Sequence, residues 1–454
     1  MKTRIGLAIA IALLGCLTSL APAHATRIDA FTFFIPYPSE ALDDQFDAAH
    51  HTSFKGSDIT TTISISVLRE GSVIYYDHWE DGLERNITYP TQTSTQVWGP
   101  LSAGDVIPLQ NAVPVEPRDP RLVLFDGGDK IVSVGGAVAV ILAVWPETVP
   151  EPGTGDPIPG ILFAGAWELY PTSRWGRDYV VSVGEDVNRA EGSFGVVGLN
   201  VQALKGGTSV DFDLDADGHF EITGHPLDEG GQFTRVRGVN AGAEVRASSP
   251  VQVHVFTGNP VNSYEARAYT MLPRDQWTND YLAPRSSGGD FWLYNPHDDD
   301  LLVAVQTISA SESITVPAKS VVKYPPVGLS TATGVHFTAT DEFYGVVALD
   351  DTEDQDWGYP LLPVENLTTQ ALVGWAPSDH NDPPGPPGDP NPDESRLYVT
   401  AIDQTTVAVD YDNDGTSDAS YSVAPLAEVD ITDPSDRDMT AGFSSIFMPW
   451  EAAT

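Results

Sequence analysis

Two short acidic stretches have the spacing of a metal-binding loop. In "DFDLDADGHFE" (211–221), aspartates occupy alternate positions just before a glycine. Carboxylates this close repel one another unless a cation neutralises them. Sets of oxygen ligands with flexible geometry suit Ca²⁺ better than Mg²⁺ or Zn²⁺. The stretch therefore predicts a calcium loop whose ligands are Asp213, Asp215, Asp217, the backbone carbonyl of His219, and Glu221.

The second stretch, "DYDNDGTSD" (410–418), repeats this spacing. Neither loop is an EF-hand, because position 12 is Gly224 or Tyr421 instead of a bidentate glutamate. Over nine residues, each loop resembles the calcium hairpins of integrin-type β-propellers. An acidic turn without an ion is the alternative. The ligands predicted for the second loop are Asp410, Asp412, Asp414, the backbone carbonyl of Thr416, and Asp418.

A third acidic stretch, "YYDHWEDGLE" (75–84), allows two interpretations. Asp77 and Asp81 could act as paired acids on a glycoside, or the stretch could be a structural or degenerate ion loop. We favour the loop. The chain also lacks a nucleophile elbow, a phosphate loop, a zinc-protease motif and a dinucleotide fingerprint. The sequence therefore predicts a protein that is not an enzyme.

The elements that position these loops are expected to be β-strands. Short segments such as "TTISISV" (61–67) and "SVDFDLD" (209–215) alternate with a period of two, and turn residues separate them. We find no helical stripe of useful length. The chain also contains 40 glycines and 36 prolines, which punctuate strands and turns. These features predict an all-β chain of antiparallel sheets.

A repeat organises the strands. The pattern Pro-x-x-x-Trp-x-x-x-Tyr occurs in 170–181 and 272–283, and Leu367 replaces the tryptophan in a third copy. The tryptophans and tyrosines are expected to fill the core. One hairpin is expected to recur in each unit, with carboxylates in only some copies. The repeat predicts one repetitive domain, 26–454, with units at about 28–160, 161–265, 266–357 and 358–454.

Two architectures suit such a repeat. A closed β-propeller with seven or eight blades would hide every sheet edge, which a chain without disulfides needs to protect. Tandem β-sandwiches are the alternative. We expect the propeller.

The N-terminus indicates export. Basic Lys2 and Arg4 precede an apolar run, and a small-residue cleavage site ends at Ala25, so residues 1–25 read as a signal peptide. Lipidation at Cys16 is the alternative. Cys16 is the only cysteine, so the mature chain would contain no disulfide. No later segment is apolar enough for a transmembrane helix. The protein is therefore predicted to be secreted or on the cell surface.

The charge balance limits the partners. Asp plus Glu number 64 against 23 Lys plus Arg, a net charge of −41. Nucleic acid is excluded because binding it requires a basic surface. An extracellular glycan or protein remains as the expected ligand.

Several stretches together resemble a known family, among them "VIYYDHWEDGLE", "LPRDQWTNDYLAP" and "NLTTQALVGWAP". They are similar to bacterial secreted surface proteins and to the N-terminal region of IgGFc-binding-protein-like extracellular proteins, from about residue 28 to 450. The resemblance implies adhesive or matrix-associated proteins and supplies no catalytic residues.

The resulting hypothesis is a secreted, non-catalytic, calcium-stabilised binding or adhesion module of the bacterial cell surface or matrix. One alternative is a carbohydrate-active hydrolase or lyase that uses Asp77 and Asp81. Another is a structural sheath or coat component.

Overall fold

The computed structural model is built almost entirely of antiparallel strands, with a single α-helix among the described residues. The all-β prediction is therefore confirmed. The predicted signal peptide lies outside the described residues. These residues are 30–49, 58–79, 82–84, 87, 95–113, 125–150, 157–159, 164–187, 192–260, 266–285, 289–324, 333–349, 358–373, 397–411, 415–432 and 444–447.

The first unit pairs two four-stranded sheets around one core. Ile63 of the second sheet and Ile74 of the first belong to the same buried cluster. A β8–β9 hairpin (Thr148–Pro150, Pro157–Pro159) is attached to this unit. In sheet order, the strands are β1 (Ala30–Phe34), β6 (Lys130–Val134), β3 (Ser72–Asp77) and β4 (Gln96–Leu101), then β10 (Gly165–Leu169), β7 (Val138–Pro146), β2 (Ile59–Val67) and β5 (Val106–Val113).

In the second unit a long strand lies at the centre of one seven-stranded sheet. The first half of β16 (Glu244–Gly258) pairs with β13 and β11, and its second half pairs with β12 and β17. Strands β6 and β7 of the first unit occupy the corresponding two places. The other strands are β11 (Gly176–Val180), β12 (Val196–Ala203), β13 (Thr208–Asp213), β14 (Ile222–Leu227), β15 (Gln232–Arg235) and β17 (Ala266–Thr270).

The third unit repeats this arrangement around β23 (Gly334–Ala348). Its first half pairs with β20 and β18, and its second half with β19 and β24. The other strands are β18 (Thr278–Pro284), β19 (Asp290–Tyr294), β20 (Leu301–Gln306), β21 (Ser311–Val316), β22 (Val321–Tyr324), β24 (Gly358–Pro360) and β25 (Leu362–Pro363).

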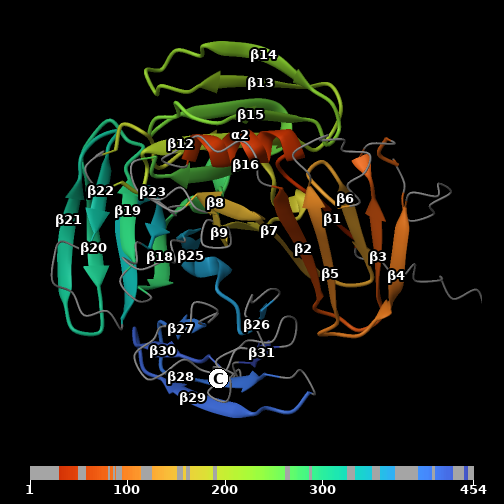
Figure 1. Cartoon of the computed structure of the whole chain (residues 1–454). Helices are drawn as coiled ribbons and strands as arrows, with labels where there is room; N and C mark the ends of the chain where they lie inside the picture. Colours follow the sequence, from red (N-terminus) through yellow and green to blue (C-terminus); the bar gives the residue numbers. More distant parts are fainter. Residues whose placement is uncertain are drawn as a thin grey trace, which may run out of the picture.

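The fourth unit has a smaller set of described strands. One sheet has the order β26-β31-β28-β29, which matches β11-β16-β13-β14, and β27 pairs with β30 in a second sheet. In Figure 1 the first unit lies at the right, the second at the top, the third at the left and the fourth below. The strands are β26 (Gln370–Val373), β27 (Tyr398–Thr400), β28 (Thr405–Asp410), β29 (Ala419–Val423), β30 (Glu428–Asp430) and β31 (Ser444–Phe447).

These pairings do not show a propeller. In a propeller each blade is a sheet of its own, arranged radially about a channel. Here β16 and β23 each lie inside one continuous sheet, of seven and eight strands respectively, instead of a separate four-stranded blade. Strand β10, which follows residue 160, pairs with β7 of the first unit. Local alternation is the same in blades and in paired sheets, so the sequence could not separate them.

One helix was not predicted. Helix α2 (Ser39–Ala49) buries Leu42 and Phe46, which lie four residues apart on one face. Phe46 packs edge-on against Phe256 of β16 at 5.3 Å, and Gln45 Nε2 donates to the carbonyl of Val236 at 3.0 Å. The helix therefore joins the first unit to the second.

The repeated tryptophan and tyrosine are structural, as expected. Trp175, Tyr179, Trp277 and Tyr281 are at most 8% exposed. Each tyrosine hydroxyl accepts the backbone N–H three residues earlier, at 3.0 Å, and donates to a carbonyl of the long strand, at 2.7 or 2.8 Å. Leu367, in the third copy, is 43% exposed. A short 3₁₀ helix follows each proline: η4 (Thr172–Arg174), η6 (Arg274–Gln276) and η7 (Val364–Asn366).

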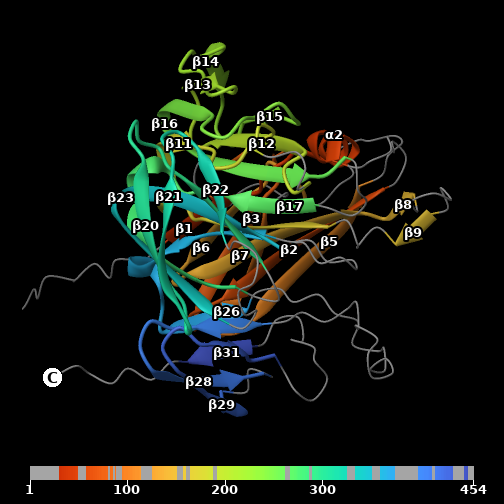
Figure 2. The same ribbon diagram turned by 90° about the vertical axis from the view of Figure 1, so that its left-hand side faces the viewer.

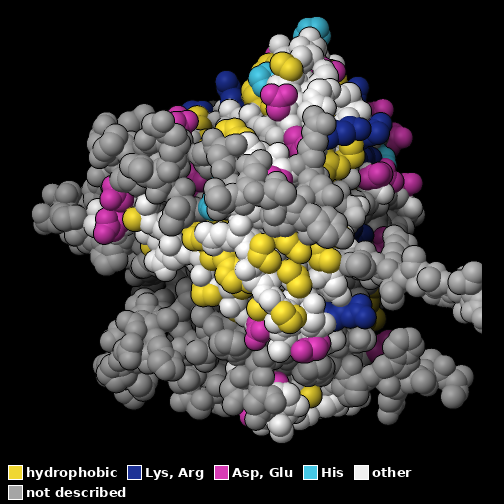
Figure 3. Space-filling view, turned by 90° about the vertical axis from the view of Figure 1, so that its right-hand side faces the viewer, with side chains coloured by type: hydrophobic (Ala, Val, Ile, Leu, Met, Phe, Trp, Pro, Cys, Tyr) yellow, Lys and Arg dark blue, Asp and Glu magenta, His cyan; other side chains and the backbone are white. Residues whose placement is uncertain are grey.

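The first unit differs from its repeats in its outer face. Tyr75 lies opposite Val97 and Val132, and Val73 lies opposite Val134, on the side away from the core. Figure 3 views the side where this unit lies and shows hydrophobic side chains gathered there. The positions equivalent to Tyr75 and Val132 are polar or small in the second and third units: Asp211 and Arg246 in the second, Ala304 and Thr338 in the third.

Candidate cation site

The predicted acidic loop joins β13 to β14, in a hairpin that projects at the top of the molecule (Figure 2). Asp213 is the last residue of β13 and is 1% exposed. Asp215 and Glu221 lie at the surface. Gly218 has a φ of +86°, a conformation that favours glycine and lets the chain turn sharply. The loop therefore combines one buried carboxylate with two exposed ones.

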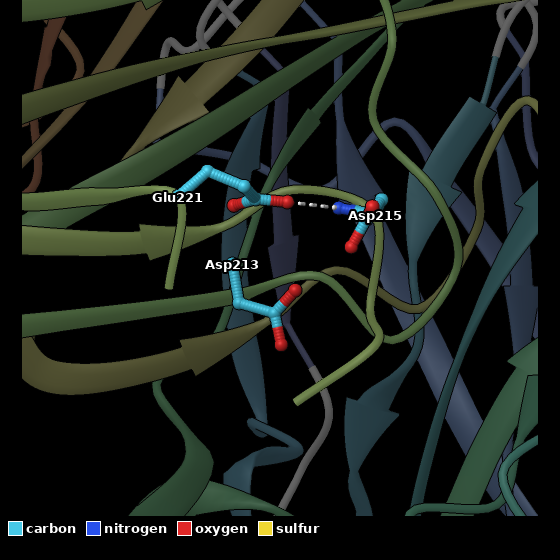
Figure 4. A group of neighbouring side chains, drawn as sticks. All are labelled: Asp213, Asp215 and Glu221. Carbon is cyan, nitrogen blue, oxygen red and sulfur yellow. Dashed lines mark hydrogen bonds between the residues drawn. The ribbon is translucent and has the colours of Figure 1, made fainter. Parts of the chain in front are cut away.

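Three carboxylates converge in this loop. One oxygen each from Asp213, Asp215 and Glu221 lies within 4.8 Å of the others (Figure 4). Backbone N–H groups fix two of the side chains. Gly218 N donates to Asp213 Oδ2 at 2.8 Å, and Leu214 N donates to Glu221 Oε2 at 2.9 Å. The group is therefore held in place by the fold of the loop.

One oxygen of this group has no hydrogen-bond donor. Asp213 Oδ1 is buried and accepts no hydrogen bond. Leaving a buried acceptor unsatisfied costs about 1–3 kcal/mol, and more when the group is charged. A cation between the three carboxylates would supply the missing partner. The potential metal ligands here are all oxygen atoms, and such a set suits a hard cation such as Ca²⁺.

The carboxylates also perturb one another. Desolvation and a hydrogen bond with Glu221 raise the pKa of Asp215 above its usual 3.8. Burial would raise the pKa of Glu221, but the N–H groups of Leu214 and Asp215 outweigh it and hold this pKa below 4.5. The pKa values of these two carboxyl groups are therefore shifted in opposite directions. A bound cation would favour the ionised form of both.

Two predicted ligands lie outside this triad. Asp217 Oδ1 accepts the backbone N–H of His219 at 2.7 Å, in a local turn. Ala216, between two of the aspartates, has a φ of +62°, which is uncommon for a residue with a Cβ. The loop therefore brings together three of the five predicted ligand residues through their side chains.

The second loop repeats two contacts of the first. Gly415 N donates to Asp410 Oδ2 at 2.9 Å, and Tyr411 N donates to Asp418 Oδ2 at 2.7 Å. Asp410 is 1% exposed, as Asp213 is. Thr416 is exposed in the turn. Asp412 and Asp414, two further predicted ligands, lie outside the described residues.

The strand pairing relates one position in each of the four units, which is an aspartate in three of them and Gln306 in the third unit. Each position is the last residue of its strand, which is β3, β13, β20 or β28. It pairs with a residue of the neighbouring strand, which is β6, β16, β23 or β31. The four pairs are Asp77 with Lys130, Asp213 with Glu244, Gln306 with His336, and Asp410 with Ser445. In the first unit a lysine therefore stands opposite the aspartate, whereas in the second unit a further carboxylate does.

The first of these positions is part of the core. Asp77 is fully buried, and its Oδ2 accepts the backbone N–H of Glu84. Lys130 donates from Nζ to the carbonyl of Glu84 at 3.0 Å and to Glu229 Oε1 at 2.7 Å. Asp81, the second acid of the alternative in which the two residues are catalytic, lies outside the described residues. A fully buried Asp77 suits a structural role.

A pocket of about 370 Å³ lies beside the second unit. Three of its four charged lining residues have ion-pair partners, because Arg246 pairs with Glu244 and Arg274 pairs with Glu342. Its lining residues are Asp178, Tyr179, Val180, Glu244, Arg246 and Arg274.

The described residues contain no helix long and apolar enough to cross a membrane. In comparisons with known proteins, no family model matches the chain, and no curated protein matches it. The resemblance to IgGFc-binding-like surface proteins therefore stays a prediction.

Proposed function

We propose that this chain is a secreted, non-catalytic binding or adhesion module whose second unit is stabilised by Ca²⁺. The observation that carries the calcium proposal is the buried Asp213 Oδ1, which has no hydrogen-bond donor and lies beside Asp215 and Glu221. A hairpin that needed no ion would gain by donating an N–H to this oxygen or by exposing it to water.

The architecture supports a role in binding. Repeated paired sheets are a common scaffold for extracellular recognition. Net charge of −41 argues against nucleic acid and for an ion-rich exterior. The buried position of Asp77 argues against a pair of catalytic acids in the first unit. The export signal and the extracellular ligand, a glycan or protein, are parts of the same proposal.

Isothermal titration calorimetry with Ca²⁺ tests the ion. We expect binding to wild type, much weaker binding of Mg²⁺, and loss of one site in Asp213→Asn. Asp211→Asn is the matched control, because Asp211 lies two residues earlier on β13 and its Oδ1 accepts the Gly224 N–H. Absence of heat at millimolar Ca²⁺ would refute the metal proposal.

A glycan and protein array, probed with and without Ca²⁺, tests binding, and the same glycans are then assayed for cleavage. We expect retention without turnover. Turnover that Asp77→Asn abolishes would instead identify a hydrolase or lyase.

A further inference from the structure

In the second unit, residues 240–243, which precede β16, contact the acidic loop. Asn240 N donates to the carbonyl of Leu214 at 2.9 Å, and Asn240 Nδ2 donates to the carbonyl of Asp215 at 3.1 Å. Two carbonyls of the loop are thus fixed by one residue, which is not itself a carboxylate ligand. Asn240 therefore holds the backbone on which Asp215 is mounted.

The same segment meets the third unit. Gly242 has a φ of +92°, and a Cβ added there would lie 2.8 Å from Tyr294 Oη and 3.3 Å from the Cβ of Ala216. Tyr294 ends β19 of the third unit and is 4% exposed. Gly242 is therefore packed between the acidic loop on one side and the neighbouring unit on the other.

In the first and third units, comparable contacts are made by the residue just before the equivalent strand and by the first residue of that strand. In the first, Asp129 accepts the Trp79 N–H beside the end of β3, and the next residue, Lys130, pairs with Glu229 of the second unit. In the third, Thr333 Oγ1 accepts the N–H of Ile308 at the end of β20. The next residue there, Gly334, donates its N–H to Leu426 of the fourth unit. In all three units, residues at or just before the start of this strand therefore contact both a strand-end loop and the next unit.

We propose that Asn240 and Gly242 are positioning residues through which cation binding at Asp213, Asp215 and Glu221 orders the junction between the second and third units. This inference rests on the proposed calcium site. Without a cation, repulsion among the carboxylates loosens the loop and, with it, the surface that Gly242 presents to Tyr294. With the cation bound, the loop and the junction are fixed together.

Amide hydrogen exchange with mass spectrometry, with and without saturating Ca²⁺, tests the coupling on the full chain. In wild type, Ca²⁺ should slow exchange in 213–221 and also, by at least about fivefold, in 289–297 of the third unit. In Asn240→Ala, which keeps all three carboxylates, 213–221 should still be protected at saturating Ca²⁺, and the effect on 289–297 should disappear. Tyr294→Phe removes the hydroxyl beside Gly242 on the third-unit side of the junction. It should reduce the slowing of exchange that Ca²⁺ causes in 289–297.

The matched control is Asn279→Ala. Asn279 Nδ2 also donates to a backbone carbonyl, that of Ala339, at 2.9 Å, from an exposed position away from the loop. In Asn279→Ala, Ca²⁺ should slow exchange in 289–297 as it does in wild type. Loss of this slowing in Asn279→Ala would contradict a specific role for Asn240. If Ca²⁺ slows exchange in 213–221 alone in wild type, the coupling is wrong and the calcium site stands. If calorimetry detects no binding and exchange is unchanged everywhere, both proposals fail.

Discussion

A lysine opposite Asp213 should replace the cation. In the first unit, Lys130 stands opposite the buried Asp77, whereas in the second unit Glu244 stands opposite the buried Asp213. Glu244→Lys would therefore give the second unit the charge arrangement of the first. We expect this variant to be more stable than wild type without calcium and to bind calcium more weakly.

The strand geometry sets the magnitude. Side chains directly opposite on antiparallel strands have Cβ atoms about 5 Å apart. At that separation and an effective dielectric constant near 20, two unit charges interact by about 3 kcal/mol. The side chain of Glu244 is 35% exposed, so solvent screening reduces the value to roughly 1–2 kcal/mol. The calcium Kd should therefore rise about tenfold.

Calorimetric titration gives the Kd, and urea unfolding in EGTA gives the stability of the calcium-free protein. Glu244→Gln is the control, because it removes the ion pair with Arg246 without adding a positive charge. Its Kd should change far less than that of Glu244→Lys. An unchanged Kd in Glu244→Lys, with no gain in stability in EGTA, would refute the view that Asp213 lacks a counter-charge.

Three further predictions concern stability. Calcium at a hundred times its Kd should raise the Tm of wild type and of Asp211→Asn by roughly 5–10 °C in scanning calorimetry; a rise of the same size in Asp213→Asn would contradict the site. Tyr281→Phe removes a hydroxyl that joins two buried backbone groups, so urea unfolding should show a loss of about 1–3 kcal/mol, and a loss below about 0.5 kcal/mol would argue against this role. Burial lowers the pKa of His254 from 6.5 to about 3, so the native state favours the neutral ring, and the stability that this ring contributes is lost as the pH falls below 6.5 towards 3. His254→Gln should therefore make the free energy of unfolding depend less steeply on pH in this range. An unchanged dependence would assign the loss of stability to other groups.

The local pattern of the chain was enough for the fold class and for the position of the loop. Alternation with a period of two predicted antiparallel strands, and the spacing of Asp213, Asp215 and Glu221 placed three oxygens in one turn, because both depend on residues close in sequence. Helix α2 was missed, although Leu42 and Phe46 have helical spacing. A single helix of 11 residues among strands gives a weak signal.

Tertiary structure decided what lies opposite the loop. Glu244 meets Asp213 through strand register, and Asn240 reaches Asp215 across 25 residues of chain. The same applies to the architecture, since a propeller and paired sheets have the same alternation within each strand. Whether β16 belongs to a four-stranded blade or to a sheet of seven strands depends on which strands pair with each of its halves. These pairings are non-local, and no property of the residues within a single strand specifies them.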